Sequence, residues 1–209
     1  MDDAIYVTRT ALRLLDATAY ACYTGHQGQL SSYPATYRNS AEKGIRAMTG
    51  TVILSIRQNH ALEHATISTL IKRVGLNVRM VGCAVHDGFY LYGDVPTEDV
   101  RDSATEALER LQQGERDLAV SPFCGTNLVV AGIMAGIASL LVLGGSDRRK
   151  RLLPVIIATT WAIVASRPVG RAVQKYITTT SNLSGVRIKR ITRRGVGARI
   201  LHKVETTRA

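Results

Sequence analysis

The spacing of apolar residues predicts a long helix in the first half of the chain. Between residues 51 and 74, apolar side chains recur at intervals of three and four, which is the spacing of one helix face. Gly75 is expected to end the helix, because Lys72 and Arg73 suit the last turn and glycine tolerates a left-handed C-cap. The predicted inner face consists of Ile53, Ile56, His60, Glu63, His64, Ile67, Ile71 and Val74.

After this helix the period changes from helical to alternating. Residues 78–95 alternate around the turn pair Asp87-Gly88, which predicts a β-hairpin. Pro96 stops the pattern, and Thr97 followed by two acidic residues predicts the N-cap of a second helix. The apolar face of that helix runs to Gly114. Together these elements form a helix–hairpin–helix layer.

The end of the chain alternates apolar with basic residues. This pattern covers residues 186–204 and is interrupted by Gly195, so it predicts a C-terminal β-hairpin. Such a hairpin could return to pair with residues 78–95. The order of elements therefore predicts an α+β fold.

Two apolar runs separate the α+β layer from the basic tail. Residues 127–145 are long enough to cross a bilayer core of about 30 Å as a helix. Residues 118–146 contain no charged side chain. A second run, residues 152–173, has Arg167 near its end. We expect a transmembrane hairpin with a short or tilted second arm. The alternative is a buried core helix.

These patterns divide the chain into four parts. Residues 1–50 are expected to form an extension, with a helix at 4–23 and an irregular linker at 24–40. The α+β domain, the membrane hairpin and the basic tail are expected to cover residues 51–120, 121–175 and 176–209 respectively.

Composition favours a membrane and a reducing compartment. The 209 residues carry a formal net charge of +11, which calls for an anionic neighbour. We favour lipid headgroups over nucleic acid, because the tail lacks aromatic side chains on which bases could stack. The three scattered cysteines do not suggest a disulfide framework. The residues after Met1 do not form an export signal, so we expect a bacterial inner-membrane protein with both termini in the cytoplasm.

Two histidines and a glutamate interrupt the apolar face of the first helix. His60 and His64 are four residues apart and can hold one cation, with Glu63 beside them in the order H-x-x-E-H. In the inverted zincins this order binds Zn²⁺ and places the carboxylate as the base for water. The alternative is that both rings make hydrogen bonds within a packed interface.

Cys124 is the candidate third metal ligand. It lies in the segment that leads into the first apolar run, and a thiolate would complete a His-His-Cys set with one open position. Cys83 and His86 are weaker candidates. The alternative for Cys124 is a simple helix cap.

Part of this pattern resembles the core of the pitrilysin/insulinase metallopeptidases. The likeness rests on residues 60–64, the strands ending at residues 88–95, and Glu106-Ala107-Leu108 in the following helix. It implies that His60 and His64 are zinc ligands and that Glu63 is the general base. Those enzymes take a third ligand from a downstream glutamate, and the corresponding distance falls here within the apolar run.

A closer resemblance is to an uncharacterised family of small bacterial membrane proteins, found notably in photosynthetic bacteria. It covers about residues 51–190 and implies the same fold without an activity. The segments that carry it are HALEHAT at 60–66, ALERLQQGE at 107–115, CGTN at 124–127 and Arg167-Pro168-Val169-Gly170.

The sequence leaves two functional hypotheses. The first is a membrane-anchored zinc protein that hydrolyses peptides, with Glu63 as the catalytic residue. The second is a non-catalytic subunit or assembly factor of a bacterial membrane complex, such as a photosynthetic one. Direct pigment binding in the apolar runs is disfavoured, because no histidine lies within them.

Overall fold

The computed structural model describes residues 35–75, 78–144, 151–195 and 200–208, with the backbone alone for 35–48. The chain divides into two compact units, Met1–Gly50 and Thr51–Ala209. The predicted helix at 4–23, the first part of the predicted linker and the basic residues before Arg151 lie outside the described residues. Apart from the start of the first helix, everything below belongs to the second unit.

Helix α3 spans Ala35–Val74 and is longer than the sequence pattern predicted. The irregular linker is therefore wrong for residues 35–40, which are part of this helix. The predicted end is confirmed: Gly75 adopts φ 83° and its N–H donates to the carbonyl of Ile71 at 2.9 Å. This left-handed residue stops the helix just before the sheet begins.

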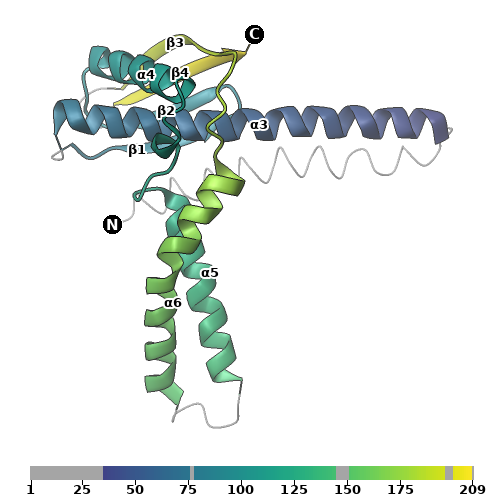
Figure 1. Cartoon of the computed structure of the whole chain (residues 1–209), viewed down its shortest axis with the longest axis vertical. Coiled ribbons are helices and arrows are strands. Elements are labelled where there is room, and N and C mark those ends of the chain that lie inside the picture. Colours follow the sequence, from purple (N-terminus) through teal and green to yellow (C-terminus); the bar gives the residue numbers. More distant parts are fainter. Residues whose placement is uncertain (1–34, 76–77, 145–150, 196–199, 209) are drawn as a thin grey trace. The chain divides into compact units, whose positions relative to one another are not determined.

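Four antiparallel strands form one sheet in the order β1-β2-β4-β3. Strand β2 lies between β1 and β4, so the C-terminal strand pairs with the central hairpin, with Phe89 opposite Val204 (Figure 1). A bulge lies between Ile188 and Arg190. The strands are β1 (Val81–Val85), β2 (Gly88–Tyr92), β3 (Val186–Arg194) and β4 (Leu201–Arg208).

The hydrophobic core joins the sheet to α3 and to helix α4 (Thr97–Gln112). Phe89 and Leu91 of β2 are fully buried together with Leu62 of α3 and Val100 of α4. Helices and an antiparallel sheet thus share one core, which confirms the predicted α+β class. The apolar residues at alternate strand positions and at helical spacing on α3 and α4 supply this core.

The prediction that Thr97 is the N-cap of α4 is wrong. Pro96 occupies the N-cap position, and Thr97 is the first helical residue. Its hydroxyl lies 3.1 Å from Nε2 of His202 on β4, so a tertiary contact replaces the expected local one. Glu98 and Asp99 occupy the first turn, as expected for the positive end of a helix dipole. A 3₁₀ turn, η1 (Arg116–Ala119), follows and was not predicted.

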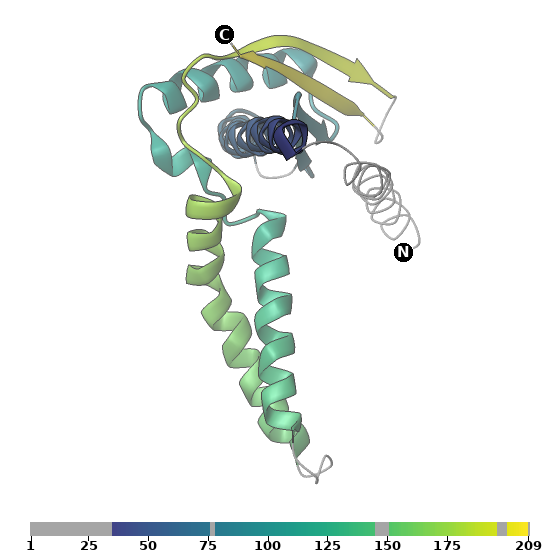
Figure 2. The ribbon, with the colours of Figure 1, turned by 90° about the vertical axis from the view of Figure 1, so that its right-hand side faces the viewer.

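Helices α5 (Gly125–Leu143) and α6 (Leu152–Val173) lie side by side and extend away from the α+β layer (Figures 1 and 2). Among the described residues, these two helices are long and apolar enough to cross a membrane. Their apolar side chains face outward rather than into a protein core. The π-helix η3 (Gln174–Thr178) continues α6 back toward α3 and was not predicted.

The close approach of β2 to β4 depends on Gly88. This residue has φ 147°, and a Cβ atom at this position would collide with the backbone carbonyl of Val204. We expect Gly88→Ala to lower the free energy of unfolding by about 2–4 kcal/mol, because backbone strain and a steric clash add together. Denaturant titration in detergent solution measures this loss.

Gly114→Ala is the matched control. Gly114 has φ 97°, but nothing lies within 4 Å of an added Cβ atom. We expect Gly114→Ala to lower the free energy of unfolding by only about 1–2 kcal/mol, which is the cost of a left-handed backbone conformation at a residue with a Cβ atom. Equal losses in the two variants would show that the contact between Gly88 and Val204 does not constrain the sheet.

Candidate metal centre

One turn of α3 places His60, Glu63 and His64 beside the base of α5 and α6. His64 is 2% exposed and Glu63 is 6% exposed, while His60 is half-buried. The ring centroids of His60 and His64 lie 4.4 Å apart, as expected for residues four apart on one helix face. The two rings are therefore adjacent and do not point to separate parts of the molecule.

Backbone carbonyls orient both imidazole rings. Nδ1 of His60 lies 3.1 Å from the carbonyl oxygen of Thr178, and Nδ1 of His64 lies 2.9 Å from that of Ala119. Because a carbonyl only accepts a hydrogen bond, each Nδ1 carries the proton, and Nε2 of the neutral ring keeps its lone pair. This is the tautomer in which Nε2 can ligate a metal, with a carbonyl holding the ring in place.

Nε2 of His64 is buried without a hydrogen-bond partner among the described residues. A buried polar atom in this state costs free energy of about 1–3 kcal/mol. A cation at this position would use the lone pair and remove the cost. The alternative prediction, in which both rings make hydrogen bonds within a packed interface, accounts for the two Nδ1 atoms but not for this Nε2 atom.

Cys124 completes the cluster from the other side. Its Sγ lies 3.3 Å from Nε2 of His60, and the ligand atoms of His60, His64 and Cys124 all lie within 4.8 Å of one another. Cys124 is also the N-cap of α5, where Sγ accepts the N–H of Thr126 at 3.4 Å. The two interpretations of Cys124 are thus compatible, because the capping position is what aims the thiol at the histidines.

The pKa of Cys124 lies below the usual value for a thiol. Burial alone would raise this pKa, but the His64 ring, when it is protonated in the metal-free protein, and the N–H of Thr126 favour the thiolate and outweigh burial. Cys83 differs, because burial and the nearby Glu63 charge raise its pKa. Of these two cysteines, Cys124 is the one whose environment favours the form that binds metals.

Glu63 lies against strand β1, where Gly82 makes room for it. A Cβ atom at residue 82 would collide with the Glu63 carboxylate, so a larger residue there would require this side chain to move. Burial raises the pKa of Glu63 to about 7, although His60 acts to lower it. The carboxylate therefore gains and loses its proton near neutral pH, which suits a general base.

A cavity of about 430 Å³ opens over this cluster. It combines the polar site with apolar walls from three elements. The residues that line it are Ile56, His60, Glu63, His64, Ile67, Met80, Val81, Gly82, Cys83, Ala84, Ser121, Phe123, Cys124, Gly125 and Thr126.

The two weaker candidates are not part of the ligand set. Cys83 lines the cavity but is absent from the group of ligand atoms within 4.8 Å. His86 lies in the turn between β1 and β2, where its carbonyl accepts a hydrogen bond from Asn59. The structure thus brings together the predicted set, His60, His64 and Cys124.

A buried glutamine fixes the segment that carries Cys124. Gln174 is fully buried; its Nε2 donates to Oδ1 of Asn127 at 2.7 Å, and its Oε1 accepts the N–H of Ser121 at 2.9 Å. Gly170 lies against Asn127, and a Cβ atom there would collide with the amide. Sequence analysis missed this network, although an uncharged polar residue directly after an apolar run is a signal for it.

Arg57 ties α3 to the end of α6 one turn before His60. Its guanidinium donates to the carbonyls of Tyr176 at 3.0 Å and Thr179 at 2.9 Å. These carbonyls flank that of Thr178, which orients His60. Arg57 was also missed, because its role depends on a segment more than a hundred residues away.

The fold and the site define a class of protein. It is an α+β protein with two apolar helices and a His/Cys cluster where these helices meet the α+β layer. The chain belongs to the family described as domain of unknown function (DUF6391), which matches residues 55–191. That range includes all four candidate site residues.

An uncharacterized protein of the cyanobacterium Picosynechococcus sp. (strain ATCC 27264 / PCC 7002 / PR-6) is 36% identical to this chain over 147 residues. The match covers 63% of this chain and 69% of the relative. Membership of an uncharacterised family is thus confirmed, whereas the resemblance to pitrilysin is not tested by these comparisons. No solved structure matches the chain.

The opposite pKa shifts of the two cysteines predict a difference in alkylation. In metal-free protein, iodoacetamide should label Cys124 with a midpoint below the usual thiol pKa of about 8.5, and Cys83 with a midpoint above it. Peptide mass spectrometry across a pH series measures both midpoints in one sample. In His64→Ala, the midpoint of Cys124 should rise while that of Cys83 stays in place. Identical midpoints in the original protein would contradict the assigned environment.

Proposed function

We propose that this protein is a membrane-anchored zinc-binding protein and a hydrolase of the inverted-zincin type that acts on peptides. The observation that carries the proposal is the convergence of His60, His64 and Cys124, whose ligand atoms lie within 4.8 Å of one another. Three separate segments supply the supporting contacts. Glu63 then has the role of the catalytic residue.

The donor set suits zinc. Two imidazole nitrogens and one thiolate match the ligands that Zn²⁺ prefers, and three protein ligands leave a fourth tetrahedral position open. The unpartnered Nε2 of His64 and the lowered pKa of Cys124 supply donors in the required form. The adjoining cavity gives the open position access to a second molecule.

Glu63 supplies the acid–base chemistry in this proposal. When bound, a zinc ion with an open position supplies Lewis acidity, which lowers the pKa of a water molecule there. The Glu63 carboxylate lines the same cavity, where it would take a proton from an attacking water molecule and return it to the leaving amine.

The second candidate function is non-catalytic. The carbonyls that orient the histidines belong to Ala119, shortly before α5, and to Thr178, at the end of η3. A metal ion here would also fasten the α+β layer to both helices, as required of a structural subunit or assembly factor of a bacterial membrane complex. This arrangement supports the non-catalytic function as the alternative proposal. The role of Glu63 distinguishes it from the hydrolase.

We place the protein in the bacterial inner membrane, with α5 and α6 as a spanning hairpin and both termini in the cytoplasm. Support comes from the length and outward apolar faces of the two helices. Arg167, Arg171 and Lys175 follow the apolar part of α6 and suit contact with anionic headgroups.

Metal binding is tested by removing one ligand at a time. We expect the purified protein to hold one zinc ion per chain, and His64→Ala or Cys124→Ser to bind zinc at least about 100-fold more weakly, because loss of a ligand exceeds the effect of a supporting contact. Competition with a chromogenic chelator measures the affinities. His86→Ala is the matched control and should retain the original affinity.

Two results would contradict the site. One is equal zinc affinity in His64→Ala and the original protein. The other is cobalt-loaded protein whose absorption spectrum lacks a thiolate charge-transfer band, because such a spectrum removes Cys124 from the ligand set.

The substitution Glu63→Gln separates the catalytic from the structural function. It should keep one zinc ion per chain and lower the hydrolysis of fluorescent casein by at least about 100-fold, because the amide cannot accept the proton. Loss of zinc would instead make Glu63 a ligand. Stoichiometric zinc in the original protein without any cleavage of casein would favour the non-catalytic function.

A further inference from the structure

The face of α3 that carries the candidate ligands continues as an exposed apolar surface. Ile53 and Ile56 lie seven and four residues before His60, so the helical repeat places them on the same side. Ile53 is 52% exposed, and Val52 beside it is also exposed. In the opposite direction, Ile67 continues this face past the histidines.

The segment before α5 and the π-helix η3 after α6 extend this surface. Phe123, directly before Cys124, is 82% exposed, and Tyr176 and Ile177 on η3 are also exposed. All three lie within two residues of a group that builds the site, namely Cys124 or the carbonyl of Thr178. Exposed apolar side chains gathered around one part of a folded protein are typical of an interaction site.

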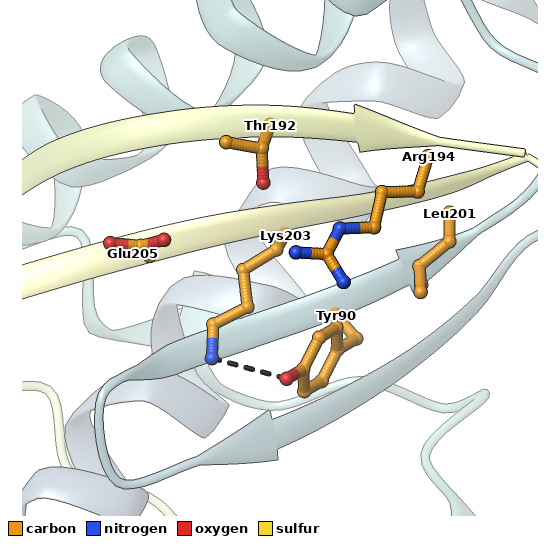
Figure 3. Close-up of a pocket in the computed structure, with 6 residues that line it drawn as sticks. All are labelled: Tyr90, Thr192, Arg194, Leu201, Lys203 and Glu205. Atoms are coloured by element: carbon orange, nitrogen blue, oxygen red, sulfur yellow. Dashed lines mark hydrogen bonds between the residues drawn. The ribbon is translucent and has the colours of Figure 1, made fainter.

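The opposite side of the α+β layer is polar. On the open face of the sheet, Lys203 donates to Tyr90 at 3.2 Å and pairs with Asp87 at 2.8 Å, and Arg194 lies beside them (Figure 3). This face surrounds a small polar cavity that contains none of the candidate site residues. The layer thus presents charge on the sheet and apolar side chains on the metal-bearing face of α3.

The apolar surface is continuous with the apolar helices. Helix α5 starts at Gly125, directly after Phe123 and Cys124, and η3 returns from α6 to contact α3 through Arg57. Figures 1 and 2 show α5 and α6 leaving from beneath α3, on the side away from β3 and β4. If these helices cross a bilayer, its surface lies at the level of residues 123 and 176.

We propose that the metal-bearing face of α3, together with Phe123, Tyr176 and Ile177, is seated in the lipid headgroup region of the membrane that α5 and α6 cross. This inference rests on the spanning hairpin of the proposed function. Val52, Ile53 and Ile56 then enter the boundary between headgroups and acyl chains, as in an interfacial helix. Arg171 and Lys175 are exposed within about a turn of this level and can reach lipid phosphates.

This seating defines what can reach the candidate metal centre. Ile56, Ile67 and Phe123 form the apolar part of the cavity wall and belong to, or adjoin, the buried surface. The cavity therefore opens along the bilayer surface. The seating favours a ligand that is held at the membrane over one dissolved in bulk water.

Tryptophan quenching by brominated lipid tests the seating. The chain has one tryptophan, Trp161, on the outer side of α6, so the original protein reports on the hairpin. In a Trp161→Phe background, Ile53→Trp and Arg101→Trp place the reporter on α3 and on the exposed side of α4. Each protein is reconstituted in phosphatidylcholine/phosphatidylglycerol vesicles without bromine, with bromine on the upper acyl chain, or with bromine near the end of the acyl chain, which reports on the bilayer centre.

We expect Ile53→Trp to lose fluorescence in brominated vesicles and to be shielded from iodide, whereas Arg101→Trp shows the reverse. Phe123→Trp, at a second exposed position, should follow Ile53→Trp and guards against a local folding defect. Quenching of Trp161 without quenching at residues 53 and 123 would overturn this inference and leave the spanning hairpin intact. Failure to quench Trp161 would overturn the spanning hairpin itself, and this inference with it.

Discussion

A lone pair on a buried imidazole is the constraint on which the site depends. Two rings on one turn of α3 each donate a hydrogen bond to a backbone carbonyl, and this leaves Nε2 as the atom with the lone pair on both. Nε2 of His60 then meets the thiol of Cys124, while that of His64 has no partner among the described residues. The N-cap of α5 and the contact of η3 with α3 help to hold this geometry.

Those carbonyls also explain why the α+β layer and the apolar helices meet at the site. Ala119 precedes α5 and Thr178 ends η3, so each ring is fastened to one end of the helical pair. Gln174 connects the same two ends through Asn127 and Ser121. A position where polar groups converge beside apolar helices is suited to chemistry or assembly at a membrane.

Local patterns were enough to predict most elements and the residues of the cluster. The four-residue spacing placed His60 and His64 side by side, Gly75 ended α3, and length and hydropathy alone identified α5 and α6. Cys124 was predicted because a thiol stood where an apolar helix begins. These signals lie within a few residues of the features that they predict, so tertiary packing had little opportunity to override them.

Contacts between distant segments could not be predicted. Every residue has a backbone carbonyl, so the sequence does not show that the one of Thr178 contacts His60. The contact between Gly82 and Glu63 could be predicted only from the position of β1 against α3. Tertiary contact with His202 likewise displaced Thr97 from its expected cap. The sequence separation of 118 between His60 and Thr178 also orders the events of biosynthesis. The carbonyl that orients His60 is synthesised only after both apolar helices, so the geometry of the site is completed last.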